Sequence, residues 1–95
     1  MEFGRYLVLS TVHVCMKTAD LLDAWAVLEP SSRPLAVAST HYGWFIPTRE
    51  PEESDRQLIP EEVLAAMRLG REQACDYLLF DCDAGEITDL TIFPW

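Results

Sequence analysis

Two segments with helical spacing, which alternate along the chain with short apolar runs, constrain the fold most strongly. In residues 17–28 (KTADLLDAWAVL), apolar side chains recur on one face at Leu21, Trp25 and Leu28. A second helix is predicted to begin at Pro60, because proline tolerates the first helical position, and to end near Ala74. Each helix is amphipathic and therefore needs a surface on which to bury its apolar face.

The apolar runs before, between and after these helices are typical of strands. They are residues 5–11 (RYLVLST), 35–48 (LAVASTHYGWFIPT) and 75–81 (CDYLLFD). The second run is long enough for two strands that turn near His41 and Gly43, because THYG offers the polar residues and the glycine that a tight turn requires. The segment therefore predicts a hairpin.

The remaining segments complete one domain. Residues 49–58 are charged and contain a proline, which predicts a mobile loop, and residues 87–95 predict a final strand or a tail. The order β-α-β-β-α-β predicts a single α+β domain over residues 1–95. Its two helices would pack on one face of an antiparallel or mixed sheet of four to five strands, as in ferredoxin-like folds.

The charge of the chain limits its partners. Sixteen acidic and seven basic residues give a net charge of −9, which opposes direct binding to nucleic acid and suits a basic protein surface. No apolar run approaches the ~20 residues that cross a bilayer, and the N-terminus lacks a signal-peptide pattern, so we expect no membrane association. Three cysteines predict no disulfide framework and a reducing, cytoplasmic location. No cofactor is expected.

The stretch LLFDCDAGEIT, residues 78–88, resembles the aspartate motif of haloacid dehalogenase-type phosphotransferases. That chemistry needs a cation and further carboxylates, yet no lysine follows Asp81 and Asp83. An EF-hand loop beginning at Asp81 would need oxygen ligands and a glycine where Gly85 and Glu86 stand. The residues therefore predict a strand followed by a turn.

A polar cluster is the alternative enzymatic hypothesis. Ser10, His13, Asp81 and Asp83 would meet at one sheet edge if the first and last strands are neighbours, and would then form a small active or metal site. His13 and Cys15 would also offer two zinc ligands. The set would be completed by His41, Cys75 or Cys82, although no CxxC or HxxxH spacing is present.

Aromatic residues are the candidates for binding a partner. These are Tyr42, Trp44, Phe93 and Trp95, because exposed tryptophan and tyrosine are enriched at binding hot spots. In a strand, Trp44 and Phe45 point to opposite faces, so one ring would be buried and the other would lie at the surface. Trp44 would equally serve as the cover of a small core.

Several stretches resemble a small uncharacterised family encoded on bacterial plasmids, prophages and integrative elements. They are LVLST and the following histidine at residues 7–13, TADLLD at 18–23, YGWF at 42–45, GREQACDYLLFDCD at 70–83, and the closing Pro94-Trp95. The chain departs from this pattern at Ala84, where glycine is expected, and in the tail sequence DLTIF. The resemblance implies a mobile-element context and supplies no activity or catalytic residues.

Three hypotheses of function follow. The leading one is a non-enzymatic accessory protein that binds a protein partner, with a homodimer as one possible form. The second is a small enzyme or metal-binding protein that uses the polar cluster. The third is an anti-defence protein whose carboxylates imitate the phosphates of nucleic acid.

Overall fold

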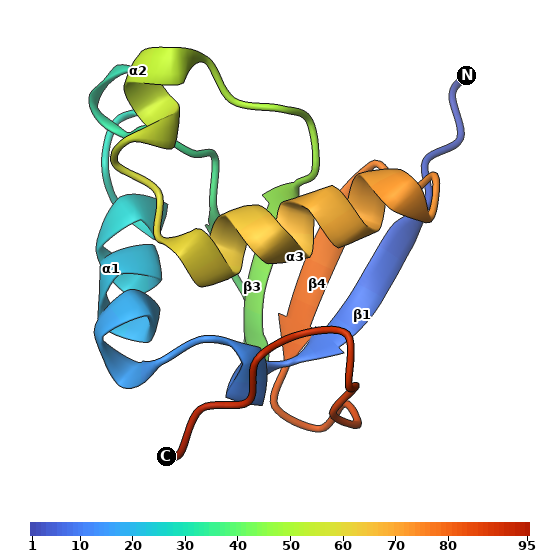
Figure 1. Cartoon of the computed structure of the whole chain (residues 1–95). Helices are drawn as coiled ribbons and strands as arrows, with labels where there is room; N and C mark the ends of the chain where they lie inside the picture. Colours follow the sequence, from blue (N-terminus) through green and yellow to red (C-terminus); the bar gives the residue numbers. More distant parts are fainter.

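The sheet has four strands in the order β1-β4-β3-β2, in a computed structural model that describes residues 1–95 (Figure 1). The strands are β1 (Tyr6–Ser10), β2 (Ala38–Ser39), β3 (Gly43–Pro47) and β4 (Tyr77–Asp81). β1 runs parallel to β4, whereas β4 with β3 and β3 with β2 are antiparallel. The predicted α+β class and mixed four-stranded sheet are confirmed, as is the hairpin within residues 35–48.

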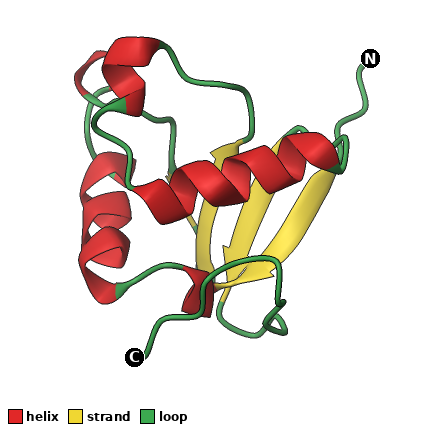
Figure 2. Ribbon diagram, in the orientation of Figure 1, coloured by secondary structure: helices red, strands yellow, loops and turns green.

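The helices lie against this sheet and beside it (Figure 2). They are α1 (Met16–Ala26), α2 (Glu53–Arg56) and α3 (Glu61–Glu72), with 3-10 turns η1 (Thr11–His13) and η2 (Pro30–Ser32). α1 and α3 confirm the two predicted helices, but α1 ends at Ala26, so Leu28 is exposed, and Leu22 rather than Leu21 is buried with Trp25. The expectation of a loop over residues 49–58 was incomplete, because acidic side chains at Glu53 and Asp55 favour the start of the short α2. None of the helices has the length and apolar character needed to cross a lipid bilayer.

The ferredoxin-like strand order is not confirmed. β1 is an edge strand with a single neighbour, β4, and the two strands that flank α3 along the chain are antiparallel neighbours. The loop and α2 after β3 return the chain to the start of α3, which then crosses one face of the sheet and ends near the start of β4 (Figure 1). Residues 87–95 form no strand and remain a tail.

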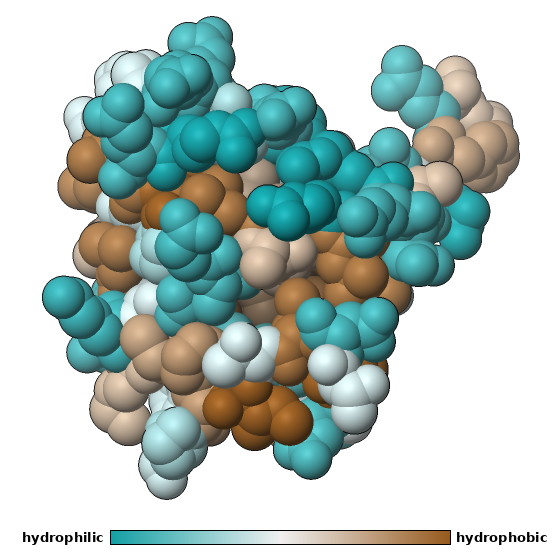
Figure 3. All heavy atoms as spheres, in the orientation of Figure 1, coloured by the Kyte–Doolittle hydropathy of each residue, from teal (hydrophilic) through white to brown (hydrophobic).

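The core lies between the sheet and the helices. Side chains alternate along each strand, so one face of the sheet contributes Leu9, Trp44, Ile46, Leu78 and Phe80, all buried. The helices contribute Leu22, Trp25, Val63, Ala66 and Met67. Seen from the helix side, hydrophilic residues cover α2 and the outward side of α3, and apolar atoms show below α3 (Figure 3).

Two glycines permit close contacts that position these elements. A Cβ at Gly43 would lie 1.9 Å from the carbonyl oxygen of Phe80, so only glycine allows the start of β3 to approach the end of β4. A Cβ at Gly70 would lie 2.5 Å from Cγ2 of Thr48 and 2.9 Å from Cδ2 of Leu78. Gly70 therefore allows α3 to lie close to the sheet.

Candidate partner-binding site

The polar cluster predicted from the sequence is brought to one end of the sheet but is not joined by hydrogen bonds. Ser10 and Asp81 are register partners on the parallel strands β1 and β4. The Ser10 hydroxyl accepts from the backbone N–H of Val12 at 3.1 Å, and Asp81 accepts from the backbone N–H of Asp83 at 2.8 Å. Each side chain therefore stabilises its own local turn, and together they form no nucleophile–base pair.

His13 is engaged through both ring nitrogens. Its Nε2 accepts from the backbone N–H of Ile87 at 3.1 Å, which leaves the proton on Nδ1, and Nδ1 donates to the carbonyl of Thr91 at 2.9 Å. The ring is only 1% exposed. Because both nitrogens are occupied by backbone groups, His13 has no free lone pair for a metal ion or for general-base chemistry.

The zinc set considered from the sequence is likewise not assembled. The Cys15 thiol lies 3.3 Å from Oγ1 of Thr18, and the Cys75 thiol lies 3.6 Å from the carbonyl of Gln73. The one group of metal-ligating side chains is Asp81, Cys82 and Asp83, whose ligand atoms lie within 4.8 Å of one another. These residues form an exposed turn, and their proximity reflects their adjacency in the chain.

Aromatic residues, by contrast, converge on a pocket of about 260 Å³ beside the β2–β3 turn, at the end of the sheet where β1 and β4 finish. We call it the aromatic pocket, and its lining residues are Thr11, Asp23, Ser39, Thr40, Tyr42, Gly43, Trp44, Cys82 and Trp95. It contains three of the four aromatic candidates predicted from the sequence. Phe93, the fourth, does not line it and instead donates its backbone N–H to the carbonyl of Val12 at 2.8 Å.

The β2–β3 turn places Tyr42 at the rim of the pocket. The Thr40 hydroxyl accepts from the backbone N–H groups of Tyr42 and Gly43, at 3.1 and 3.0 Å, and Thr40 N–H donates to the Gly43 carbonyl at 2.8 Å. These bonds fix a tight turn. Tyr42 remains 52% exposed and meets the ring of His41 edge-on, with centroids 5.1 Å apart.

Trp44 forms the inner wall, and the exposed Asp23 lies beside it. Trp44 is 7% exposed and faces the core, so of the two alternatives that the sequence left open for this ring, the structure shows the core position. Phe45, the next residue of β3, faces outward. The indole Nε1–H of Trp44 donates to Oδ1 of Asp23 at 2.8 Å. Asp23 lies on α1, so this bond connects the helix to the hairpin.

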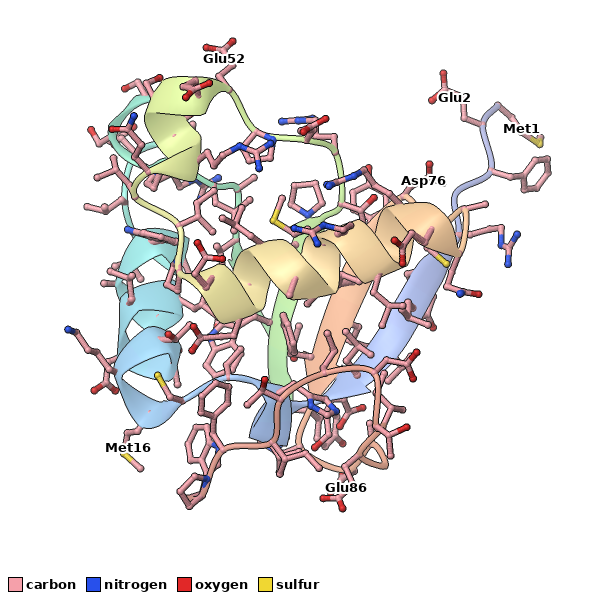
Figure 4. All side chains as sticks on the ribbon, viewed as in Figure 1. Met1, Glu2, Met16, Glu52, Asp76 and Glu86 are labelled. Carbon is pink, nitrogen blue, oxygen red and sulfur yellow. The ribbon has the colours of Figure 1, made fainter.

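The tail supplies the opposite wall. The indole Nε1–H of Trp95 donates to the carbonyl of Val14 at 3.1 Å, while the residue as a whole is 58% exposed. The turn after β4 adjoins the pocket through Cys82, whose N–H donates to the Tyr42 carbonyl at 3.0 Å. Carboxylates follow along this loop, and Glu86 points outward from it (Figure 4).

Residues 6–95 match the family described as "Family of unknown function (DUF5983) C-terminal domain". The chain belongs to the DUF5983 family. No curated protein and no solved structure matches it. The match confirms an uncharacterised family and assigns no activity to this DUF5983 domain.

Two features of the DUF5983 domain were missed from the sequence. Asp23 was overlooked because a single carboxylate on a helix has no spacing that marks it. The second feature is the outward face of the sheet, where Tyr6, Val8 and Tyr77 are 56%, 44% and 41% exposed. In the strands YLVLS and YLLFD, apolar residues occupy positions on both faces of the sheet, and this pattern was the available signal.

Proposed function

We propose that this protein is a non-enzymatic interaction protein that binds a basic side chain of a protein partner in the aromatic pocket. The observation that carries the proposal is the position of the Asp23 carboxylate among the rings of Tyr42, Trp44 and Trp95. Aromatic faces attract lysine and arginine cations by about 0.5–2 kcal/mol, depending on desolvation. A carboxylate beside such rings adds a charge-assisted hydrogen bond for the same cation.

Asp23 has no basic partner within the chain. Trp44 donates to one carboxylate oxygen, Oδ1, and the single ion pair of the molecule joins Arg56 to Glu50 at 2.6 Å. The segment after β4, which adjoins the pocket through Cys82, is also acidic. It carries Asp83, Glu86 and Asp89, and no lysine or arginine follows Arg71 in the chain. A cation supplied from outside would therefore neutralise Asp23.

The wider context is part of the same proposal. We take the partner to be a protein of the bacterial host or of a mobile element, acting in the cytoplasm, because the sequence motifs resemble those of element-encoded proteins. Direct binding to nucleic acid is disfavoured by the net charge of −9. The phosphate-mimic alternative receives less support, because Arg49 and Arg56 stand among the carboxylates of the α2 region and give it both signs of charge.

The enzymatic alternative is also less well supported. Ser10 and Asp81 each accept from a nearby backbone N–H, and His13 is bonded through both ring nitrogens to backbone groups of the tail, so it has no nitrogen available for proton transfer. An enzyme would need these side chains within reach of one another in a concave site.

The test uses defined peptides and a matched pair of variants. A short peptide of alternating alanine and arginine is titrated into the protein, and binding is followed by calorimetry and by the tryptophan fluorescence of the pocket. Asp23→Asn removes the charge but retains an oxygen for the Trp44 indole. Asp20→Asn removes an exposed charge from the same helix, away from the pocket. We expect Asp23→Asn to weaken binding about tenfold and Asp20→Asn to leave it nearly unchanged.

Tyr42→Ala should weaken the same peptide by about threefold to tenfold, because its ring is lost from the rim. The aromatic control is Tyr77→Ala, which removes a similarly exposed ring outside the pocket. Equal losses in Asp23→Asn and Asp20→Asn, or binding of a glutamate peptide as tight as that of the arginine peptide, would contradict the proposal.

A further inference from the structure

The outer face of the sheet carries a cluster of three aromatic rings, whereas α3 crosses the opposite face (Figure 2). The ring of Phe45 stacks on that of Tyr77, with centroids 5.0 Å apart, and Tyr6 meets Phe45 edge-on at 6.1 Å. Tyr6 and Tyr77 are 56% and 41% exposed. Because the solvent face of a sheet normally carries polar side chains, an apolar surface at this place indicates an interaction site.

A groove of about 300 Å³ lies beside the stacked rings. Ala38 and Phe45 are opposite each other on β2 and β3, and they therefore share the outer face of the sheet. Both residues line the groove, together with Pro47 and Tyr77. The small side chain of Ala38 leaves space beside the large ring of Phe45, and this space forms part of the groove.

Two arginines give the groove its charge. Arg33 and Arg49 line it and no carboxylate does, so we call it the arginine groove. Nη1 of Arg33 donates to the carbonyls of Trp25 and Val37, each over 3.3 Å. These bonds hold the guanidinium in place and do not use its Nε or Nη2. Arg49 is exposed and takes no part in the single ion pair of the molecule. Both arginines therefore retain donors for an external acceptor.

Nearby carboxylates restrict which acidic ligands are attracted. Arg49 also lines a neighbouring hollow together with Glu50, Glu52 and Asp55, and none of these three is paired with it. The net charge of −9 repels acidic groups over most of the surface. A carboxylate is therefore attracted only close to the two guanidinium groups, and apolar contact must add to its binding.

We infer that the arginine groove binds a segment of a protein partner in which an aromatic side chain is followed by acidic residues. The aromatic ring of this segment extends the stack formed by Phe45 and Tyr77. Its carboxylates accept charge-assisted hydrogen bonds from Arg33 and Arg49, whose planar guanidinium groups match the geometry of a carboxylate.

The groove suits a protein segment better than a small molecule. Its volume of about 300 Å³ lies at the lower end of the range for pockets that enclose small ligands. The exposed side chains of Tyr6 and Val8 extend the apolar surface of this face beyond the groove, and a protein segment can cover both. The arginine groove shares no lining residue with the aromatic pocket, so this inference is independent of the function proposed above.

The test titrates the whole chain with a short capped peptide that contains one phenylalanine followed by two aspartates. Binding is followed by calorimetry and by the NMR shifts of the Ala38 and Phe45 amides. We expect a dissociation constant below ~1 mM. Replacement of both aspartates by asparagine, or of the phenylalanine by alanine, should weaken binding by about tenfold. A peptide of alternating alanine and glutamate lacks the ring and should therefore bind the groove weakly.

Variants of the chain locate the binding. Arg49→Gln should weaken the aspartate peptide by about fivefold to tenfold, whereas Arg68→Gln, at an exposed arginine on α3, removes the same charge and should leave binding nearly unchanged. Ala38→Leu fills the groove and should weaken binding without loss of charge. Asp23→Asn should have no effect here, although it should weaken the arginine peptide, so the two proposals can fail separately.

Three outcomes would overturn the inference. The first is equal binding of the aspartate and asparagine peptides. The second is an equal effect of Arg49→Gln and Arg68→Gln. The third is the absence of any binding up to ~5 mM peptide.

Discussion

His13 holds the residues after β4 against the end of β1, because its Nε2 accepts a hydrogen bond from the backbone N–H of Ile87 over 3.1 Å. The same ring donates from Nδ1 to the Thr91 carbonyl over 2.9 Å. One buried side chain therefore replaces the strand pairing that the tail lacks. The tail in turn carries Trp95 to the aromatic pocket.

We predict that His13→Phe frees the tail while the sheet remains folded. Phenylalanine fills the cavity but leaves Ile87 N–H and Thr91 C=O without partners, which should lower the free energy of unfolding by about 2 kcal/mol. Hydrogen exchange should accelerate at the amides of Ile87 and Phe93. His41→Phe, at an exposed histidine, is the control and should leave both amides protected; unchanged exchange in His13→Phe would refute the role given to this ring.

Glu62 should make stability depend on pH. Burial raises the pKa of this carboxyl, but hydrogen bonds from the Thr18 hydroxyl at 2.7 Å and from Cys15 N–H at 3.2 Å outweigh it, so the pKa lies below 4.5. A pKa that is lower in the folded state means that the ionised carboxylate stabilises the fold. Its contribution is complete above pH 4.5 and is lost as pH falls through the folded-state pKa.

Glu62→Gln should therefore lower the free energy of unfolding by about 1 kcal/mol at neutral pH, a value reduced to allow for the partial exposure of this carboxylate. Denaturant unfolding at several pH values should show the gap to wild type closing below pH 4.5. Glu61→Gln alters the neighbouring, exposed position in the first turn of α3. Its unfolding free energy should differ little from that of the wild type, and this difference should not disappear below pH 4.5. A Glu62→Gln gap that persists in acid would show that the charge is not responsible.

The loss of stability caused by each glycine-to-alanine substitution should follow how closely the new Cβ would approach its neighbours. Gly43→Ala should cost about 3 kcal/mol or more, because its Cβ would meet the backbone of Phe80, which cannot move without breaking the sheet. Gly70→Ala should cost less, about 1–3 kcal/mol, because side chains of Thr48 and Leu78 give way and alanine favours the helix. Gly85→Ala, with no neighbour within 4 Å, should change stability by under about 0.5 kcal/mol in thermal unfolding. A different order would contradict the packing at β3.

Thiol labelling should separate the three cysteines. Cys82 is exposed, Cys15 is half-buried with its thiol near Thr18, and Cys75 is buried. We expect one thiol per chain to react quickly with a disulfide reagent in native protein, and the other two only on unfolding. Cys82→Ser should abolish the fast phase, and a fast phase that survives this change would place another cysteine at the surface.

The helices and hairpin were predictable because their signals are local. The apolar spacing of Leu21 and Trp25, the proline before α3, and the THYG turn each act over a few residues. Strand order is different in kind. β1 lies beside β4 because the helices and the loop leave that edge open, and no residue in YLVLS specifies its neighbour. The ferredoxin-like prediction specified one strand order among several, and local sequence patterns do not distinguish between these orders.

The candidate site was predictable in its residue types but not in its assembly. Tyr42 and Trp95 were identified as aromatic candidates, yet it is the path of the tail that brings them together, and His13, Phe93 and Trp95 all fix that path. Trp44 was assigned to the surface or the core with equal weight, and its bond to Asp23 required the packing of α1 against the hairpin. The polar cluster was considered for its chemistry, whereas three of its members, Ser10, His13 and Asp81, satisfy backbone groups that a linear sequence does not display.

The parallel pairing of β1 and β4 has a consequence during protein synthesis. Arg5 and Asp76, which are bonded where these strands begin, are 71 positions apart. At roughly 5–20 residues per second, the ribosome leaves the first strand several seconds without its neighbour. Non-local pairings of this kind also slow folding after release. For that interval both sides of YLVLS are open, so the nascent chain is most vulnerable to misassociation before its last strand has emerged.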